Sequence, residues 1–382
     1  MVYIIVLIVL LYGSLHYNQQ NVDKNNKFLY FEYILIVLVM GLRYKVGGDS
    51  LNYFLSFQSW PTLSEISSYH FDTSKYNFGW IFFSALCKAI YDDFVTLQLV
   101  ESAIVNAAFF YFFKKNTDKY FIAILLYAVM FLFTFNTEIM RAAMSVSIFL
   151  FGFELFKQKK WIKYYILCFA AFSFHSEAIV MFLLPVCYPL SKIKISLTNL
   201  LLILIISIAT VSIFNFIPQL ANIISASNRM SMMFAIYSQV TIESNINGYI
   251  AQIFFIVPWL YFLWLSRKEK YVYWRGFVIL YIFFTFQQLR YMVFMNRACD
   301  MLYPFLIIAI VDSIRNIKYV KSSFVRMLCF ICIFVVVSLR IYNYMGNGHW
   351  KLFIPYSSVI SQTENIEREK LLYEFQNGDN FK

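Results

Sequence analysis

The sequence predicts an all-α, polytopic integral membrane protein with about 12 transmembrane helices. Of its 382 residues, 60% are hydrophobic and 14% are charged, whereas about a quarter of the residues in a soluble domain are charged. At about 20 apolar residues per crossing, this content suffices for roughly eleven or twelve helices. Neither a GxGxxG nor a Walker A run occurs, so a soluble nucleotide-binding enzyme is excluded.

Twelve apolar runs are long enough to be interpreted as spans. They cover residues 2–17, 28–44, 94–113, 119–135, 139–156, 161–174, 177–190, 197–217, 249–266, 272–288, 293–312 and 324–342. The first run lacks a basic segment before it and a small-residue cleavage site, which predicts a retained span rather than a cleaved signal. A weaker thirteenth run, 77–91, contains Lys88 and ends at Asp92. Its length and charge favour a short or re-entrant segment.

Basic clusters between the runs set the predicted orientation. They lie two spans apart, at residues 114–119, 157–163, 192–194, 267–270 and 315–321. The positive-inside rule places them in the cytoplasm and accounts for the net charge of +11 without nucleic acid. Residues 218–247 and the tail 343–382 are then external, as is the loop 45–75 if 77–91 does not span. None of these segments is large enough to fold alone, so residues 1–342 form one membrane domain.

The loop after the second run is the first candidate for chemistry. Arg43 ends the run, and Gly47-Gly48 precede Asp49 at the start of a short helix. In one interpretation Asp49 caps that helix and Arg43 extends towards the lipid headgroups. In the other, the glycines permit a tight turn or a close approach, and Asp49 is a general base beside a cation at the membrane surface.

Arg141 and His175 are the next candidates. Arg141 falls near the outer end of its helix, where a guanidinium suits the oxygens of a phosphate; an ion pair with Glu138 is the alternative. His175 stands in a turn before Ser176. An imidazole can transfer protons near neutral pH, although a hydrogen-bonded surface histidine explains it equally simply.

Two further arginines and a tail segment fall on the same predicted side of the membrane. Arg290 and Arg297 suit an anionic substrate, but Arg297 has Asp300 one helical turn on and could form an ion pair within its helix. The tail segment Pro355-Tyr356 either folds back over the membrane surface or is an ordinary turn. Several arginines around one Asp and one His describe an anion-binding site with a base, which fits a lipid diphosphate better than a cation pathway.

Neither a metal nor a cofactor is predicted. All six cysteines lie in or beside apolar runs, and no His-Cys or acidic cluster has metal-ligand spacing. The CxxC formed by Cys329 and Cys332 is interpreted as lipid-facing or core residues.

The order of these motifs resembles the EpsG family of bacterial Wzy-type polysaccharide polymerases. The resemblance rests on Arg43 through Gly47-Gly48-Asp49 to Tyr53, on Arg141-Ala142-Ala143, on His175-Ser176, on Arg297 to Tyr303 and on Pro355-Tyr356. The chain departs from the family pattern after Asp49, where Ser50-Leu51 replace aromatic residues. That difference is ascribed to the acceptor sugar.

The resemblance implies a polymerase that transfers a glycan from undecaprenyl diphosphate onto a lipid-linked repeat unit, at the outer face of the bacterial plasma membrane. The product would be an exopolysaccharide, capsule or O-antigen. Asp49 is then the leading base and His175 the second. The implied diphosphate- or sugar-binding residues are Arg43, Arg141, Arg290, Arg297, Asn52, Tyr53, Ser176, Tyr303 and Tyr356.

The implied partners are the undecaprenyl-diphosphate-linked oligosaccharide and membrane lipid, with a chain-length regulator of the same pathway as a further candidate and no nucleic acid. Two other classes stay open. A flippase of lipid-linked oligosaccharide should show repeat symmetry or paired broken helices, which the sequence does not display. A membrane glycan ligase or O-acyltransferase would use His175 as its base and leave Asp49 a structural role.

Overall fold

A computed structural model confirms that the protein belongs to the helical membrane class. It describes residues 1–17, 22–71, 76–213, 246–269, 271–289, 292–346, 348–363 and 365–377, and these residues form helices and no β-strand. Their one isolated antiparallel bridge pairs Arg43 with Ser358. The expected external loop 218–247 lies almost wholly outside the described residues.

The structure does not support the expected count of about 12 spans. In the described part of the chain, four helices are long and apolar enough to cross a membrane: Phe94–Asn116, Tyr120–Glu138, Ile246–Lys268 and Ser323–Tyr342. A pair bent by 54°, Phe294–Asp300 and Tyr303–Tyr319, raises the number to five if it acts as one span. Each expected run does contain a helix.

Length and charge explain the lower number. Six apolar helices have only 10–17 residues, including Phe78–Ile90 within the expected weak run 77–91. The helices α2 (Val22–Gly41) and α7 (Met140–Lys157) are longer but carry several charges each. Apolar composition alone therefore overstates how many helices can cross a bilayer by themselves.

The chain divides into two compact units. The first comprises Met1–Ala178 with Val337–Lys382, and the second comprises Ile179–Val336. The expected single membrane domain 1–342 stays a prediction. Helices of the first unit are α1 (Val2–His16), α2, α3 (Ser50–Ser59), α4 (Phe78–Ile90), α5 (Phe94–Asn116), α6 (Tyr120–Phe133), α7, α8 (Trp161–Phe174) and α18 (Ile366–Asn377), together with the end of α17 (Ser323–Met345).

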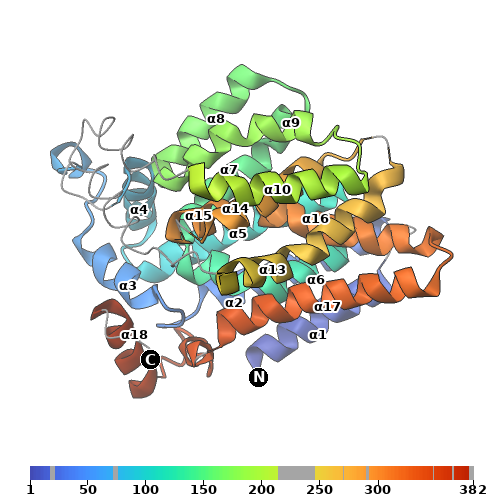
Figure 1. Cartoon of the computed structure of the whole chain (residues 1–382). Helices are drawn as coiled ribbons and strands as arrows, with labels where there is room; N and C mark the ends of the chain where they lie inside the picture. Colours follow the sequence, from blue (N-terminus) through green and yellow to red (C-terminus); the bar gives the residue numbers. More distant parts are fainter. Residues whose placement is uncertain are drawn as a thin grey trace. The chain divides into compact units, whose positions relative to one another are not determined.

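Helix α5 lies at the centre of the first unit, where it packs against α2, α4, α6 and α7 (Figure 1). The Asp93 side chain caps its start by accepting a hydrogen bond from the backbone N–H of Val95 at 2.8 Å. Its last turn carries Lys114 and Lys115, which complement the negative end of the helix dipole. Phe109, fully buried, stacks on Tyr127 of α6 at 4.3 Å between ring centroids.

A single π-helical turn, η2 (Thr134–Glu138), joins α6 to α7. Its buried Asn136 is fixed by a closed set of hydrogen bonds: Asn106 donates to Asn136 at 2.7 Å, Asn136 donates to the Tyr127 hydroxyl at 3.1 Å, and that hydroxyl donates to Asn106 at 2.9 Å. Satisfied polar networks of this kind fix one backbone arrangement. A π-turn within a helical segment often marks a functional site.

The second unit is built around α14 (Trp274–Gln287). It packs against α9 (Cys187–Leu190), α10 (Leu197–Ile213), α13 (Ile246–Leu265), α15 (Met292–Asp300) and α16 (Tyr303–Asn316). A Cβ on Gly276 would lie 2.0 Å from the Cys187 carbonyl oxygen, so only glycine permits this contact. Phe277 stacks on Phe305 with ring centroids 3.7 Å apart.

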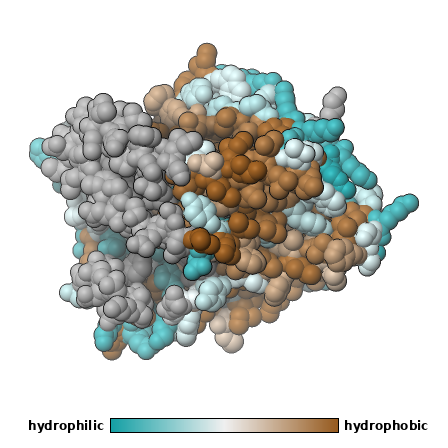
Figure 2. All heavy atoms as spheres, in the orientation of Figure 1, coloured by the Kyte–Doolittle hydropathy of each residue, from teal (hydrophilic) through white to brown (hydrophobic). Residues whose placement is uncertain are grey.

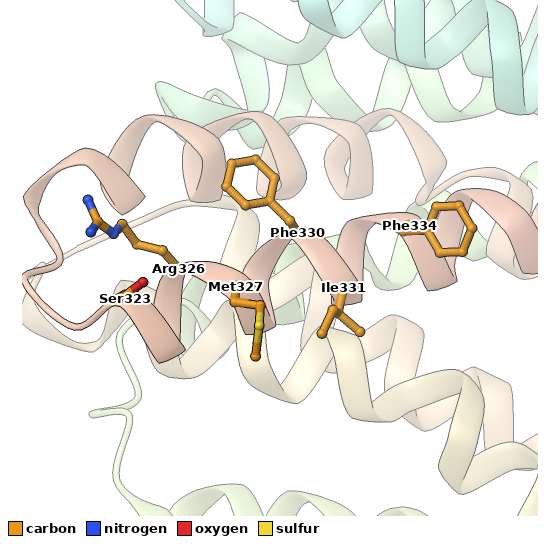
Figure 3. A pocket seen from close by; sticks show the side chains of 6 residues that line it. All are labelled: Ser323, Arg326, Met327, Phe330, Ile331 and Phe334. Carbon is orange, nitrogen blue, oxygen red and sulfur yellow. The ribbon is translucent and has the colours of Figure 1, made fainter.

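Large apolar side chains cover the outer faces of the second unit's helices (Figure 2). Phe254 of α13 is 70% exposed and Phe334 of α17 is 72% exposed. Along the first half of α17 runs a shallow hollow lined by one helix face alone, namely Ser323, Arg326, Met327, Phe330, Ile331 and Phe334 (Figure 3). Apolar surfaces of this extent suit contact with lipid.

Candidate functional site

The C-terminal tail folds back onto the loop that follows α2. The Tyr44 N–H donates to the Ser357 carbonyl at 2.9 Å, and the Val359 N–H donates to the Leu42 carbonyl at 2.9 Å. The Tyr356 hydroxyl donates to the carbonyl of Val39 at 3.0 Å. Of the two interpretations of the tail, folding back is therefore the correct one, and Tyr356 anchors it.

Helix α18 strengthens this attachment. Arg368, only 2% exposed, donates to the carbonyl oxygens of Lys45, Lys351 and Pro355, and Lys45 forms an ion pair with Glu369 at 2.7 Å. Sequence reasoning missed this role of Arg368, because nothing in the polar composition of α18 indicates a buried guanidinium.

The two glycines of the loop let it approach the π-helix. Gly47 has φ +109°, and a Cβ there would lie 2.6 Å from the Cβ of Thr137. A Cβ on Gly48 would lie 2.6 Å from Glu138 Oε2, and the Gly48 N–H donates to Glu138 Oε1 at 2.5 Å. The close approach that the glycine pair predicts is thus made to the protein's own π-turn.

Asp49 occupies the N-cap position of α3. Its backbone is helical, at φ −88° and ψ −1°, and its side chain makes no capping hydrogen bond, so capping does not account for this carboxylate. The charge of Asp49 acts on Arg141 and on the Tyr53 hydroxyl. The loop thereby places a carboxylate within electrostatic reach of a guanidinium.

Two tyrosines hold Arg141 at the start of α7. Its Nε donates to the Tyr53 hydroxyl at 3.4 Å, and its guanidinium carbon lies 4.9 Å from the centroid of the Tyr76 ring. A cation over an aromatic face gains about 0.5–2 kcal/mol, more when desolvated. Burial raises the pKa of Tyr53 to about 12, against the opposing charge of Arg141. The phenol is therefore neutral near pH 7 and keeps its proton as a donor.

Aromatic side chains continue from this pair. Tyr53 lies 5.7 Å from Trp80 between centroids, and Tyr76 lies 4.9 Å from Trp60. The indole Nε1 of Trp80 is buried, and within the described residues it has no hydrogen-bond partner. The high aromatic content of the sequence is interpreted as bilayer-interface and packing material, although sugar-binding clefts also use Tyr and Trp faces. In the structure these four rings are buried, so they form a packed aromatic wall behind Arg141.

Helix packing brings His175 to the same end of the first unit as Arg141. The Ser145 hydroxyl, one turn after Arg141, donates to the Ala171 carbonyl one turn before His175 at 2.8 Å. The Nδ1 of His175 lies 3.4 Å from Glu177 Oε2 and accepts from the Glu177 N–H at 3.3 Å. The His175 side chain is 13% exposed. It therefore lies beside a buried carboxylate rather than on an open surface.

Arg43 is placed differently from the expected diphosphate ligand. It is 1% exposed, and its guanidinium donates to the Met40 carbonyl and to the Met140 sulfur. The charge of Glu101 on α5 acts on this buried guanidinium. Among the described residues, Arg43 Nε and both Glu101 carboxylate oxygens have no hydrogen-bond partner. In this conformation the Arg43 side chain makes its contacts inside the first unit.

We predict that Arg43 and Glu101 are energetically coupled. Replacing either one alone with a neutral residue of similar size, as in Glu101→Leu or Arg43→Met, removes the opposite group that acts on the buried partner and should lower the stability of the fold. The double variant should recover most of the lost stability, because removing both charges is often neutral. Thermal unfolding of the purified protein measures the cycle, with Glu65→Gln in an exposed loop as the control. Additive losses in the double variant would contradict the coupling.

The remaining candidate site residues are divided between the two units. Asn52 lies on α3 and Ser176 follows His175, both in the first unit. Arg297 and Tyr303 belong to the second unit, where Arg297 Nη1 lies 3.8 Å from Asp300 Oδ2, as the ion-pair interpretation predicted. Arg290 lies outside the described residues. The structure thus brings together Asp49, Tyr53, Tyr76 and Arg141 in one cluster and places His175 at the same end of the unit.

Comparison with known proteins identifies one family. A sequence model of the EpsG family matches residues 26–358. No curated protein and no solved structure matches the chain. The matched range includes the loop, the π-turn, Arg141, His175 and the start of the folded-back tail.

Proposed function

The chain belongs to the EpsG family, and on that premise we propose that it is a membrane glycosyltransferase that polymerises polysaccharide repeat units. Its donor is a glycan carried on undecaprenyl diphosphate, and its acceptor is a second lipid-linked repeat unit. The observation that carries this proposal is the cluster in which the Asp49 carboxylate acts on a guanidinium held by Tyr53 and Tyr76.

The proposed reaction is a displacement at a sugar carbon. A hydroxyl of the acceptor sugar attacks the anomeric carbon of the donor glycan, the bond from that carbon to the diphosphate oxygen breaks, and undecaprenyl diphosphate leaves. The hydroxyl proton passes to the Asp49 carboxylate, as general base catalysis requires. Arg141 stabilises the negative charge that develops on the diphosphate. His175 is the second candidate for the base.

The arrangement of charges along α5 supports an outward-facing site. The 23 residues of α5 extend for about 34 Å at 1.5 Å per residue. Gln98 near its start donates to the Arg43 carbonyl at 3.1 Å, whereas Lys114 and Lys115 lie in its last turn. If those lysines are cytoplasmic, the loop with Asp49 is at the outer face of the plasma membrane.

The length distribution of lipid-linked glycans tests the proposal. A strain without this chain should accumulate single repeat units on their lipid at the outer face, and the complete chain supplied in trans should restore the ladder of longer glycans. A normal ladder without the chain would reject a polymerase. Repeat units held inside the cell would instead identify a flippase, and a normal polymer that is unattached or unmodified would identify a ligase or an acyltransferase.

A further inference from the structure

A narrow cleft of about 200 Å³ lies beside the π-turn, within the first unit. Its lining is contributed by α1, α6 and the end of α17, and it includes Tyr3, Ala128, Phe131 and Arg340. Among the described residues that line the cleft, Arg340 alone is charged. A lining of this composition fits a hydrocarbon chain that carries a negative charge at one end.

Arg340 holds a defined position at this cleft. Its Nε donates to the Met130 carbonyl at 3.2 Å, its Nη2 donates to the Thr134 hydroxyl at 2.9 Å, and its guanidinium carbon lies 4.8 Å from the Phe131 ring centroid. These contacts fix the guanidinium at the edge of the cleft. Arg340 also lies five residues before the last residue of α17, Met345, or about 7.5 Å along the helix. That depth suits contact with a lipid phosphate.

The π-turn connects the cleft to the candidate site. Thr134, which accepts from Arg340, is the first residue of the turn, and Glu138, which accepts from the Gly48 N–H, is the last. Tyr3 of the cleft also contacts the folded-back tail, with its ring 5.5 Å from that of Tyr356. Arg340 and the loop that carries Asp49 therefore contact the two ends of the same π-turn.

We propose that this cleft binds the lipid end of the substrate, a polyprenyl diphosphate. The first part of the isoprenoid chain lies among the apolar side chains of α1 and α6, and a phosphate oxygen accepts hydrogen bonds from Arg340. This inference rests on the proposed function and adds to it a binding site for the carrier. An apolar opening of this kind is needed because the carrier chain must stay in the hydrocarbon layer while its diphosphate reacts.

Binding of radiolabelled farnesyl diphosphate to the full chain in phosphatidylcholine nanodiscs tests the proposal. Arg340→Met should weaken binding about 10-fold or more, as expected for the loss of a hydrogen bond to a charged group. Ala128→Phe, which fills the cleft and keeps the arginine, should weaken it similarly. Arg326→Met is the matched control, because Arg326 lies on the first half of the same helix and outside the cleft; its binding should be unchanged. Wild-type binding by both cleft variants would overturn the proposal.

Competition distinguishes the carrier from an ordinary lipid. If phosphatidylglycerol displaces farnesyl diphosphate at equal concentration, the cleft holds a membrane phospholipid and the proposal fails. Its failure is separable from failure of the proposed function. Unchanged binding in the cleft variants, with polymer lost in a strain lacking the chain, would reject the cleft alone. Lost binding in Arg340→Met, together with a normal polymer ladder in the strain lacking the chain, would reject the polymerase and retain a lipid-phosphate site.

Discussion

Replacing Asp49 with Asn is expected to slow glycan transfer by about 10²–10⁴-fold, the usual contribution of a general base. The amide keeps the size of the side chain but cannot take the acceptor proton. Because Asn preserves the shape of the side chain at the start of α3, the exchange should leave folding intact. The measurement is the rate of repeat-unit transfer in nanodiscs with a synthetic lipid-linked unit, at saturating donor and acceptor.

Two further variants sharpen this test. Asp118 is an exposed aspartate just after the end of α5, whereas the loop contacts the start of that helix through Gln98. Asp118→Asn should therefore retain the wild-type rate. His175→Gln should reduce the rate less than Asp49→Asn, because the histidine Nδ1 is occupied by Glu177. If Asp49→Asn is fully active while His175→Gln is inactive, His175 is the base and Asp49 has another role.

Replacing Arg141 is expected to be almost as damaging. Arg141→Ala removes the cation that stabilises the departing diphosphate and should lower kcat by about 10²–10³-fold, the effect of losing a positioned oxyanion donor. Arg141→Lys should also be impaired, since an ammonium cannot make the two parallel hydrogen bonds of a guanidinium. The same transfer assay, with kcat and KM determined separately, measures both effects.

Tyr53→Phe is the matched control for Arg141. It removes the 3.4 Å hydrogen bond from Arg141 Nε but leaves the guanidinium and the Tyr76 ring in place, so its loss should be much smaller than that of Arg141→Ala. Wild-type kcat in Arg141→Lys would show that bidentate contact is unimportant. Equal losses in Tyr53→Phe and Arg141→Ala would assign Arg141 a structural role.

Composition and short motifs predicted the helical membrane class and the EpsG family, and they singled out Asp49 and Arg141 as candidates. These features depend on local residues, such as the Gly47-Gly48 pair that permits a close approach, or on charges that a membrane protein seldom carries without reason. The number of spans could not be obtained in the same way. An apolar run shows that a helix is buried or faces lipid. The length of that helix in the folded chain depends on how the neighbouring helices pack against it.

The partners of individual side chains were also beyond the sequence. Arg43 has the sequence context of a residue at the membrane surface, yet its interior position follows from Glu101 on a helix that the tertiary fold brings alongside. Glu138 precedes Arg141 by one helical turn, and local spacing predicts an ion pair between them. The structure shows Glu138 accepting a hydrogen bond from the Gly48 N–H. Local spacing identifies what a residue can reach along its own helix, but packing between helices decides which contact forms.

The attachment of the tail to the loop also sets an order of events during biosynthesis. Lys45 and Glu369, whose ion pair joins the two, are 324 positions apart in the chain. At translation rates of 5–20 residues per second, a ribosome needs about 15–65 s to proceed from one to the other. The Asp49 loop is therefore synthesised long before the tail that holds it, and a nascent chain acquires its finished site only after α18 has been made.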